Sequence, residues 1–434
     1  MFDHLKIVSP KRNRRLQTGW EGFFPYYAGF PETFARSLLA SARLQQGAVV
    51  LDPWNGSGTT TYAASQLGLA SRGLDLNPVM VIISRARLLG SSEADSIEPL
   101  AEAVTKYSRS ARKPIDIDDP LRWWFEPETA ALIRAVERSI RRRLVGGRTI
   151  TPSGTKLEKI SGMAATFYVA LFAVCRQLVA KYQSSNPTWL KRPKAADEKI
   201  AAPRSIIFKM FAGSLASMAS ALSEKGQKDL LIPEHGAWDI SLADTTTTSL
   251  PNESVDFILT SPPYCTRIDY TAATRVELAI LFPLLSVTAK DLGRQMIGST
   301  RVPDHKIEPA DRWGGTCNRF LEDLKSHPSK ASSGYYYLTH LDYFDKMDKS
   351  VARLSKCLKK GAGAVFVVQD SYYKEIHNDL PKIIGEIGEA HGLSVVRSEN
   401  FQLRRSMSGI NPRTRAYERT PGATETVLCF HKPI

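Results

Sequence analysis

A Gly-rich turn between two short predicted strands constrains this chain more than any other feature of its sequence. Residues 47–52 have the apolar run of a buried strand that ends in an acid, and residues 71–74 are predicted to form a second strand that ends at Asp75. The turn between them leads into a helical pattern over residues 59–67. A strand, a turn, a helix and a strand make a βαβ unit, which implies a right-handed crossover and a parallel sheet. The sequence therefore predicts an α/β fold.

The alternation of predicted strands and helices ends after this unit and resumes later in the chain. From residue 91 to residue 233 the apolar residues recur mostly at helical spacing, and strands are predicted again at residues 238–242 and 255–260. Residues 290–334 are rich in Gly, Pro, Ser and charged side chains, and we expect them to be mostly loop.

This pattern predicts two units. Residues 1–95 and 236–434 together are expected to form one discontinuous α/β domain that carries the chemistry. Residues 96–235 are expected to form a mostly helical insertion, which is a candidate for the recognition of a macromolecular target.

Charge and composition narrow the classes of function. The chain has 58 Lys and Arg against 44 Asp and Glu, a net charge of +14, which favours a polyanionic partner. Its five cysteines include no Cys-x-x-Cys pair and its eight histidines no His-x-x-x-His pair, so we expect no metal site and no disulfide framework. The N-terminal residues lack the apolar core of a secretory signal, and the most apolar stretch, residues 163–175, is shorter than the about 20 residues of a membrane span. A cytoplasmic protein without membrane contact is expected.

The turn from Asp52 to Thr60 has the residues of a ligand-binding loop. Gly56 and Gly58 let the backbone turn sharply and approach a ligand, and the following helix presents free N–H groups to an anionic group such as a carboxylate. Asp75 lies 75 − 52 = 23 residues after Asp52, at the end of the next strand, where a carboxylate can bind ribose hydroxyls. The turn lacks a Gly-Lys-Ser/Thr ending, which argues against a phosphate-binding loop. A nucleoside-type cofactor is favoured over a plain structural turn.

The run Ser261-Pro262-Pro263-Tyr264 directly follows a predicted buried strand, where parallel sheets place their ligands. Two prolines fix an extended backbone whose carbonyls have no competing N–H groups, and Tyr264 adds an aromatic face. These groups suit a nucleobase with an exocyclic amine. Hydrogen bonds from the amine to Ser261 and to the Pro262 carbonyl would draw its nitrogen towards tetrahedral geometry, which frees the lone pair to attack a methyl group. A rigid surface turn is the alternative reading.

The two motifs together resemble the signatures of S-adenosylmethionine-dependent DNA methyltransferases that act on exocyclic amines. The resemblance covers roughly residues 20–90 and 236–434 and is specific in its motifs. One departure is Trp54, where the family usually has Phe, and this change keeps the aromatic face. The matching residues are Asp52-Pro53-x-x-Gly56-Ser57-Gly58-Thr59-Thr60, Asp75 and Ser261-Pro262-Pro263-Tyr264.

This resemblance implies a Rossmann-like methyltransferase sheet with a large helical insertion, and S-adenosylmethionine as the cofactor. Residues 24–31 are similar to the family segment that closes over the methionine end of the cofactor, and Asp244 matches the acid near its adenine. The residues that the resemblance assigns to cofactor binding are Tyr27, Phe30, Asp52, Pro53, Trp54, Gly56, Gly58, Thr59, Thr60, Asp75, Asn77 and Asp244.

The resemblance also implies the reaction, a methyl transfer to the exocyclic amine of a flipped base held by Ser261, Pro262, Pro263 and Tyr264. Within the family, Ser at the first position favours cytosine N4, and adenine N6 is the alternative. An RNA base methyltransferase and a non-catalytic DNA-binding protein of the same fold are further alternatives. The implied partners are double-stranded DNA and a cognate restriction or defence nuclease, and the oligomeric state is open.

Basic residues in the helical insertion are the predicted contacts to DNA phosphates. They are Arg141, Arg142, Arg143, Lys191 and Arg192. Two other interpretations remain open: these arginines cover a solvated helix face, and residues 285–340 track the duplex instead. The aromatic run Trp123-Trp124-Phe125 is predicted to pack in a core rather than to insert between bases.

Overall fold

The computed structural model describes most of the chain. The described residues are 2–11, 23–24, 29–110, 114–146, 150–151, 154–155, 157, 160–184, 189–228, 236–265, 269–402 and 423–434.

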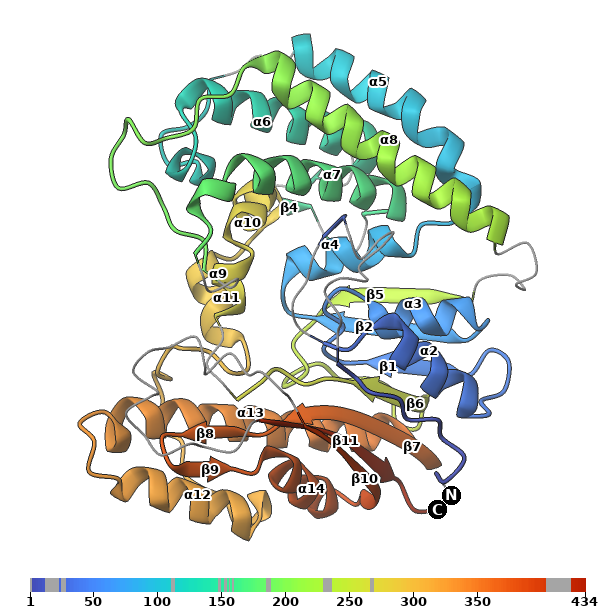
Figure 1. The fold of residues 1–434 in the computed structure, drawn as a ribbon, viewed down its shortest axis with the longest axis vertical. Helices are drawn as coiled ribbons and strands as arrows, with labels where there is room; N and C mark the ends of the chain where they lie inside the picture. Colours follow the sequence, from blue (N-terminus) through green and yellow to red (C-terminus); the bar gives the residue numbers. More distant parts are fainter. Residues whose placement is uncertain are drawn as a thin grey trace.

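A seven-stranded sheet lies at the centre of these residues (Figure 1). Its spatial order is β10-β11-β7-β6-β1-β2-β5, in which β5, β2, β1, β6 and β7 are parallel and β11 and β10 complete one edge through antiparallel pairs. The predicted α/β fold is thus confirmed. The strands are β1 (Val49–Asp52), β2 (Ala70–Asp75), β5 (Trp238–Leu242), β6 (Val255–Thr260), β7 (Leu358–Gln369), β10 (Ser394–Gln402) and β11 (Thr424–His431).

The strand order reverses between β1 and β6. From β1 the chain proceeds to β2 and β5 on one side, and from β6 to β7 on the other. Such a switch point leaves a crevice beyond the carboxyl ends of the strands, where doubly wound sheets bind ligands. Both predicted motifs follow these strands, because Asp52 ends β1 and Ser261 follows β6.

Helices cover both faces of the sheet because neighbouring strand residues point to opposite sides. Val50 packs with Phe34 of α2 (Glu32–Ser41) and lies on the face that α3 (Thr59–Gln66) also covers. Leu51 faces the other way, into a core with Phe344 and Ile384. That second core is formed with α12 (Gly315–Ser326), α13 (Tyr337–Cys357) and α14 (Leu380–Ala390).

The predicted insertion is mostly helical and lies as a layer of its own in Figure 1. Its helices share one apolar core with α4 and α10, so this core extends beyond residues 96–235. The helices of this core are α4 (Pro78–Arg87), α5 (Ala94–Ser110), α6 (Pro127–Ile140), α7 (Gly162–Leu178), α8 (Arg204–Lys228) and α10 (Arg275–Leu281). The predicted packing of the aromatic run agrees with the burial of Trp124 and Phe125, whereas Trp123 is 38% exposed.

Buried ion pairs fasten this helical layer to α10. Arg134 of α6 pairs with Asp119 at 2.9 Å and donates to the Ile280 carbonyl of α10 at 2.7 Å. Arg176 of α7 pairs with the fully buried Glu277 of α10. Because removal of one partner of a buried pair leaves an uncompensated charge, these contacts fix α10 against α6 and α7.

The prediction of a loop-rich stretch at residues 290–334 was wrong in part. Within it α12 (Gly315–Ser326) is helical, and α11 (Ala289–Gln295) reaches into its start. Phe320, Leu321 and Leu324 are buried and give α12 one apolar face, which the polar residues around them conceal in the sequence. Smaller elements complete the described chain: α9 (Tyr270–Ala273), β3 (Ile150–Thr151), β4 (Gly154–Thr155), β8 (Ser371–Tyr373) and β9 (Ile376–Asn378).

Among the described helices one segment, Arg204–Glu224 of α8, is long and apolar enough to cross a membrane by length and composition. Its residues Ile207, Phe211 and Leu215 are buried in the core that α8 shares with α5 and α7. A core helix of this kind passes the same test of length and composition.

Candidate active site

Two carboxylates at the ends of β1 and β2 organise the Gly-rich turn. Asp75 accepts hydrogen bonds from the backbone N–H groups of Gly56 and Asn77, both at 2.8 Å. Asp52 accepts from the Thr260 hydroxyl at 2.6 Å and from the Trp54 N–H at 3.2 Å. The turn is therefore folded around the acids that the sequence singled out.

Gly58 makes the step from the turn into α3. Its φ of +76° lies in the left-handed region, and a Cβ at this position would meet the Ser84 Cβ of α4 at 2.7 Å. Any larger residue would be strained by its backbone and would clash with α4. Gly58 thus shapes the turn, and Thr60 also has a structural contact, because its hydroxyl donates to the Leu259 carbonyl at 3.1 Å.

Both predicted motifs line one open pocket, whose volume is about 950 Å³ when the solvent at its mouth is included. Its lining brings together residues from the turn, from the end of β2 and from the loop after β6. The predicted site residues in this lining are Phe30, Asp52, Pro53, Trp54, Gly56, Thr59, Asp75, Asn77, Asp244, Ser261, Pro262, Pro263 and Tyr264. Gly58 and Thr60 lie behind the lining, and Tyr27 lies outside the described residues.

The loop after β6 is held from several sides. Ser261 donates its hydroxyl proton to the Val367 carbonyl of β7 at 3.0 Å, and Tyr343 of α13 donates to the Pro263 carbonyl at 2.8 Å. The Tyr264 N–H donates to the Tyr270 hydroxyl at 3.3 Å, and the Tyr264 hydroxyl donates to Glu425 at 3.3 Å. These contacts fix a backbone that the two prolines already restrict.

Burial raises the pKa values of the acids in the pocket. Desolvation raises the pKa of Asp52 to about 6, against the opposing effect of the hydrogen bonds from Thr260 and other donors. Desolvation likewise raises the pKa of Asp75 to about 6, and the nearby charge of Asp52 adds to the rise. Burial also raises the pKa of the Glu425 carboxyl, and it raises the pKa of Tyr264 above its ordinary range. The pocket therefore has two acids that titrate within two pH units of neutrality.

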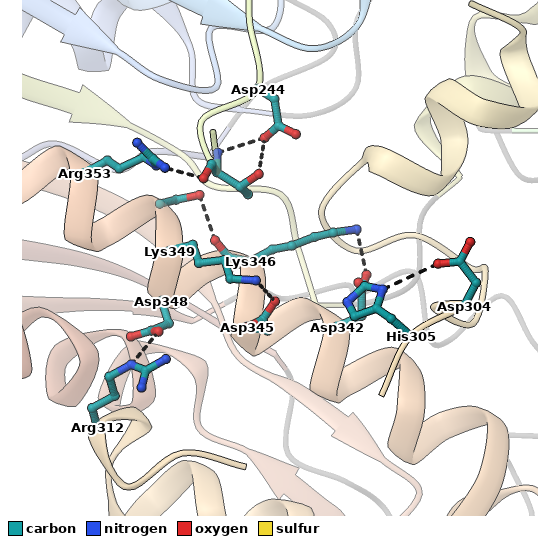
Figure 2. Close-up of polar contacts among 12 residues, drawn as sticks. Asp244, Asp304, His305, Arg312, Asp342, Asp345, Lys346, Asp348, Lys349 and Arg353 are labelled. Carbon is teal, nitrogen blue, oxygen red and sulfur yellow. Dashed lines mark hydrogen bonds and ion pairs between the residues drawn. The ribbon is translucent and has the colours of Figure 1, made fainter. Parts of the chain in front are cut away.

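Asp244 begins the short turn that follows β5. Its carboxylate accepts from the N–H of Thr246 at 2.8 Å and from the hydroxyl of the same residue at 2.7 Å, while Arg353 of α13 donates to the Thr246 carbonyl (Figure 2). The neighbouring hydroxyls of Thr245 and Ser350 lie 3.1 Å apart. The turn that places Asp244 at the pocket is therefore tied to α13.

The sequence reasoning missed one wall of the pocket. Gln295, Met296 and Ile297 line it, although they belong to no motif. Lys346 of α13 donates to the Met296 carbonyl at 3.4 Å. Its ammonium group also pairs with Asp342 at 2.8 Å (Figure 2). Tyr270, six residues after Tyr264, is a second missed residue, and only its aromatic character near the motif could have marked it.

The predicted nucleic-acid residues fall into two groups with different surroundings. Arg141 pairs with the fully buried Glu137 at 3.0 Å, and Arg142 and Arg143 lie against the Tyr107 ring. The backbone carbonyl of Lys191 accepts from Trp124, and the guanidinium of Arg192 lies 3.5 Å from the Trp123 ring centre. Arg141 therefore has a structural contact of its own, whereas the side chains of Lys191 and Arg192 are exposed.

The pocket fits a ligand that is polar at one end and apolar at the other. The carboxylates of Asp52 and Asp75 can bind hydroxyl groups and positive charge, while Leu76, Met80 and Met296 offer apolar contact. The aromatic ring of Trp54 packs edge-on against Phe366 and belongs to the lining of the pocket. These properties match S-adenosylmethionine, which combines ribose hydroxyls and a positively charged sulfonium with a flat adenine.

Comparison with known proteins confirms the family resemblance that the motifs predicted. Residues 4–85 match the N6/N4-type methyltransferase family described as DNA methylase. The chain is 23% identical over 302 residues to the type II methyltransferase M.BsoBI of Geobacillus stearothermophilus. This alignment covers 64% of this chain and 55% of M.BsoBI. The chain is also 23% identical over 429 residues to the type II methyltransferase M.AvaI of Nostoc sp. (strain PCC 7120 / SAG 25.82 / UTEX 2576), which covers 90% of this chain and 82% of that protein.

The aligned part thus spans about half the length of M.BsoBI. Among solved structures, a TehB-like SAM-dependent methyltransferase from Corynebacterium glutamicum aligns over 92% of this chain and 87% of its own, with 9% identity and a TM-score of 0.27. The fold assignment consequently rests on the strand order. The family match confirms S-adenosylmethionine as the expected cofactor.

Proposed function

We propose that this protein is an S-adenosylmethionine-dependent DNA methyltransferase that modifies the exocyclic amine of a base flipped out of the duplex. The observation that carries the proposal is that one pocket is lined both by the loop Ser261–Tyr264 and by the carboxylates of Asp52 and Asp75. A base amine and a methyl donor bound there would be neighbours, which is the proximity that a group transfer requires. The relatives M.BsoBI and M.AvaI are type II methyltransferases, which agrees with this activity.

The cofactor, when bound, supplies a methyl group activated by its positively charged sulfonium. Asp75 keeps free lone pairs beside its two backbone hydrogen bonds and accepts from the ribose hydroxyls. Asp52 places a buried negative charge in the same lining, where it attracts the cationic part of the cofactor. Phe30, Trp54 and Asp244 complete the contacts, each as a member of the lining.

The loop after β6 holds the base and prepares its amine. Because Ser261 already donates its proton to Val367, its oxygen presents lone pairs and accepts from the amine. The Pro263 carbonyl is occupied by Tyr343, so we assign the second amine proton to the Pro262 carbonyl. With both protons held, the nitrogen lone pair would bond to the methyl carbon as the bond between that carbon and the sulfonium sulfur breaks, which would leave a neutral thioether. One amine proton would then pass to solvent, and Tyr264 would stack on the ring of the base.

Cytosine N4 is the favoured target, and the experiment must separate it from adenine N6. Purified protein is incubated with mixed-sequence duplex DNA and radiolabelled cofactor, and the product is digested and analysed by nucleoside mass spectrometry. N4-methylcytosine supports the full proposal, whereas N6-methyladenine alone overturns the choice of base. Label that enters RNA but not DNA, or neither polymer, overturns the proposed activity.

The variant Tyr264→Ala tests the role of the loop in this reaction. Loss of one stacked base contact costs about 1–3 kcal/mol, so capture of the base should weaken by about five- to a hundredfold. Cofactor affinity, measured by calorimetry, should stay within twofold, roughly the effect of a mutation that leaves a site intact. Unchanged transfer to DNA by this variant would refute the assignment of the loop.

A further inference from the structure

A group of aromatic and basic side chains lies at the junction of the helical layer and α9. We call it the Trp–Arg patch, and its members are Trp123, Trp189, Arg192 and Arg275. Trp189 is 51% exposed and Trp123 is 38% exposed, which is unusual for the largest apolar side chains. The Arg192 guanidinium lies 3.5 Å from the Trp123 ring centre, and that of Arg275 lies 5.9 Å from the Trp189 ring centre.

The charges of the patch are only partly compensated within the protein. Among the described residues no carboxylate pairs with Arg192, and Arg275 meets Asp269 at the long distance of 3.8 Å. Burial and the neighbouring charge of Arg275 lower the pKa of Arg192, so the two cations lie close enough to repel each other. Arg275 is also the first residue of α10, where the helix dipole disfavours a positive charge. The positive charge of these two arginines is therefore only partly balanced among the described residues, which favours an anionic ligand.

The patch is adjacent to the pocket. Asp269, the partner of Arg275, caps α9 by accepting from the Ala272 N–H at 2.9 Å. The next residue, Tyr270, lines the pocket and accepts from the Tyr264 N–H. Figure 1 shows α9 and α10 between the helical layer and the sheet, with the segment after α7 descending to α9. A nucleic acid bound at the pocket would therefore pass over the patch.

We propose that the Trp–Arg patch binds the DNA strand on either side of the flipped nucleotide, with Arg192 and Arg275 on phosphates and Trp189 against an unstacked neighbouring base. This inference rests on the proposed function and adds to it the surface that receives the duplex. Arginine forks match phosphate geometry, and arginines paired with exposed tryptophans suit a chain of alternating charges and flat bases. The patch is distinct from Arg141–Arg143, whose surroundings are Glu137 and Tyr107.

The test is the salt dependence of binding to a labelled mixed-sequence DNA duplex, followed by fluorescence anisotropy. The double variant Arg192→Gln and Arg275→Gln should flatten the slope of log affinity against log salt by up to about 1.8, because each phosphate contact contributes about 0.9. The matched control is Lys349→Gln with Lys359→Gln, which removes the same charge from two ion pairs whose lysine side chains are about half exposed. This control should keep the wild-type slope, and both variants should keep cofactor affinity.

The aromatic part of the patch has its own variants. Trp189→Ala should weaken duplex affinity by about tenfold at fixed salt, and Trp189→Phe should restore most of it, because an aromatic face is retained. A wild-type slope in the double arginine variant, or an equal change in the control, overturns the patch and leaves the proposed function standing. Wild-type protein that methylates no DNA and binds the duplex without salt dependence overturns the proposed function itself.

Discussion

Cofactor affinity should fall as the pH is lowered from 7.5 to 5. Asp52 and Asp75 have pKa values raised to about 6 by desolvation, so both are ionised at pH 7.5 and mostly protonated at pH 5. The cofactor is cationic and offers hydroxyl donors, which bind carboxylates better than carboxylic acids. If one carboxylate must be ionised for binding, affinity should drop by about tenfold over this range, and if both must be ionised, by about a hundredfold.

The stability of the free protein should change in the opposite direction over the same range. An acid whose pKa is raised from 3.8 to about 6 holds its proton more tightly in the folded chain. For Asp52, which is 4% exposed, the favourable contribution is complete below pH 3.8 and is lost as the pH rises through 6, a difference of up to about 3 kcal/mol. A fall of affinity on acidification therefore cannot be a consequence of protonation at Asp52 loosening the fold.

Isothermal titration calorimetry at several pH values, in pairs of buffers with different ionisation enthalpies, measures both the affinity and the protons released on binding. Asp75→Asn keeps the shape of the side chain but does not titrate, so its affinity should be lower at pH 7.5 and less dependent on pH. Asp345→Asn, which changes a surface ion pair of α13, serves as the control and should follow the wild type. Affinity that is flat between pH 5 and 7.5 would refute this reasoning.

Two further variants test the frame of the pocket. Gly58→Ala places a Cβ on left-handed backbone and against Ser84 of α4. The melting temperature should therefore fall by several degrees, and cofactor affinity should fall as well. A melting curve like that of the wild type would show that the turn tolerates a Cβ. Tyr343→Phe removes the donor to the Pro263 carbonyl, which should lower the rate of methyl transfer by about tenfold while cofactor affinity is kept. Single-turnover kinetics measures that rate, and an effect confined to DNA affinity would contradict the prediction.

Local sequence patterns predicted the sheet and the two motifs because their information is short-range. The strands β1 and β6 are mainly apolar, and the acid at the end of β1 and the Ser-Pro-Pro after β6 mark their carboxyl ends. The switch point then brings Asp52 and Ser261 together, although they are 209 residues apart, because β1 and β6 are neighbours in the sheet. A parallel sheet therefore converts two local signals into one site.

The remaining features depend on tertiary contacts that no local pattern encodes. Residues 295–297 become a wall of the pocket through tertiary contacts, such as those that Lys346 of α13 makes with the carbonyls of Arg294 and Met296. Glu425 meets the Tyr264 hydroxyl from a strand that lies 161 residues further along the chain. The Trp–Arg patch likewise forms only when the segment after α7 reaches α10, since Trp189 and Arg275 belong to different predicted units.

The buried ion pairs of Arg134 and Arg176 have a consequence for protein engineering. Recognition modules are attractive parts to exchange between related enzymes, and residues 96–235 look like such a part in the sequence. In the folded chain, however, Glu277 of α10 is the counterion of Arg176, and Arg134 ends on carbonyls of the same helix. A graft cut at residues 96 and 235 would leave Glu277 buried without its counterion, whereas a graft that also carries α9 and α10 would keep Arg134 and Arg176 with these partners. The exchangeable unit thus includes α9 and α10, the helices that follow the loop after β6.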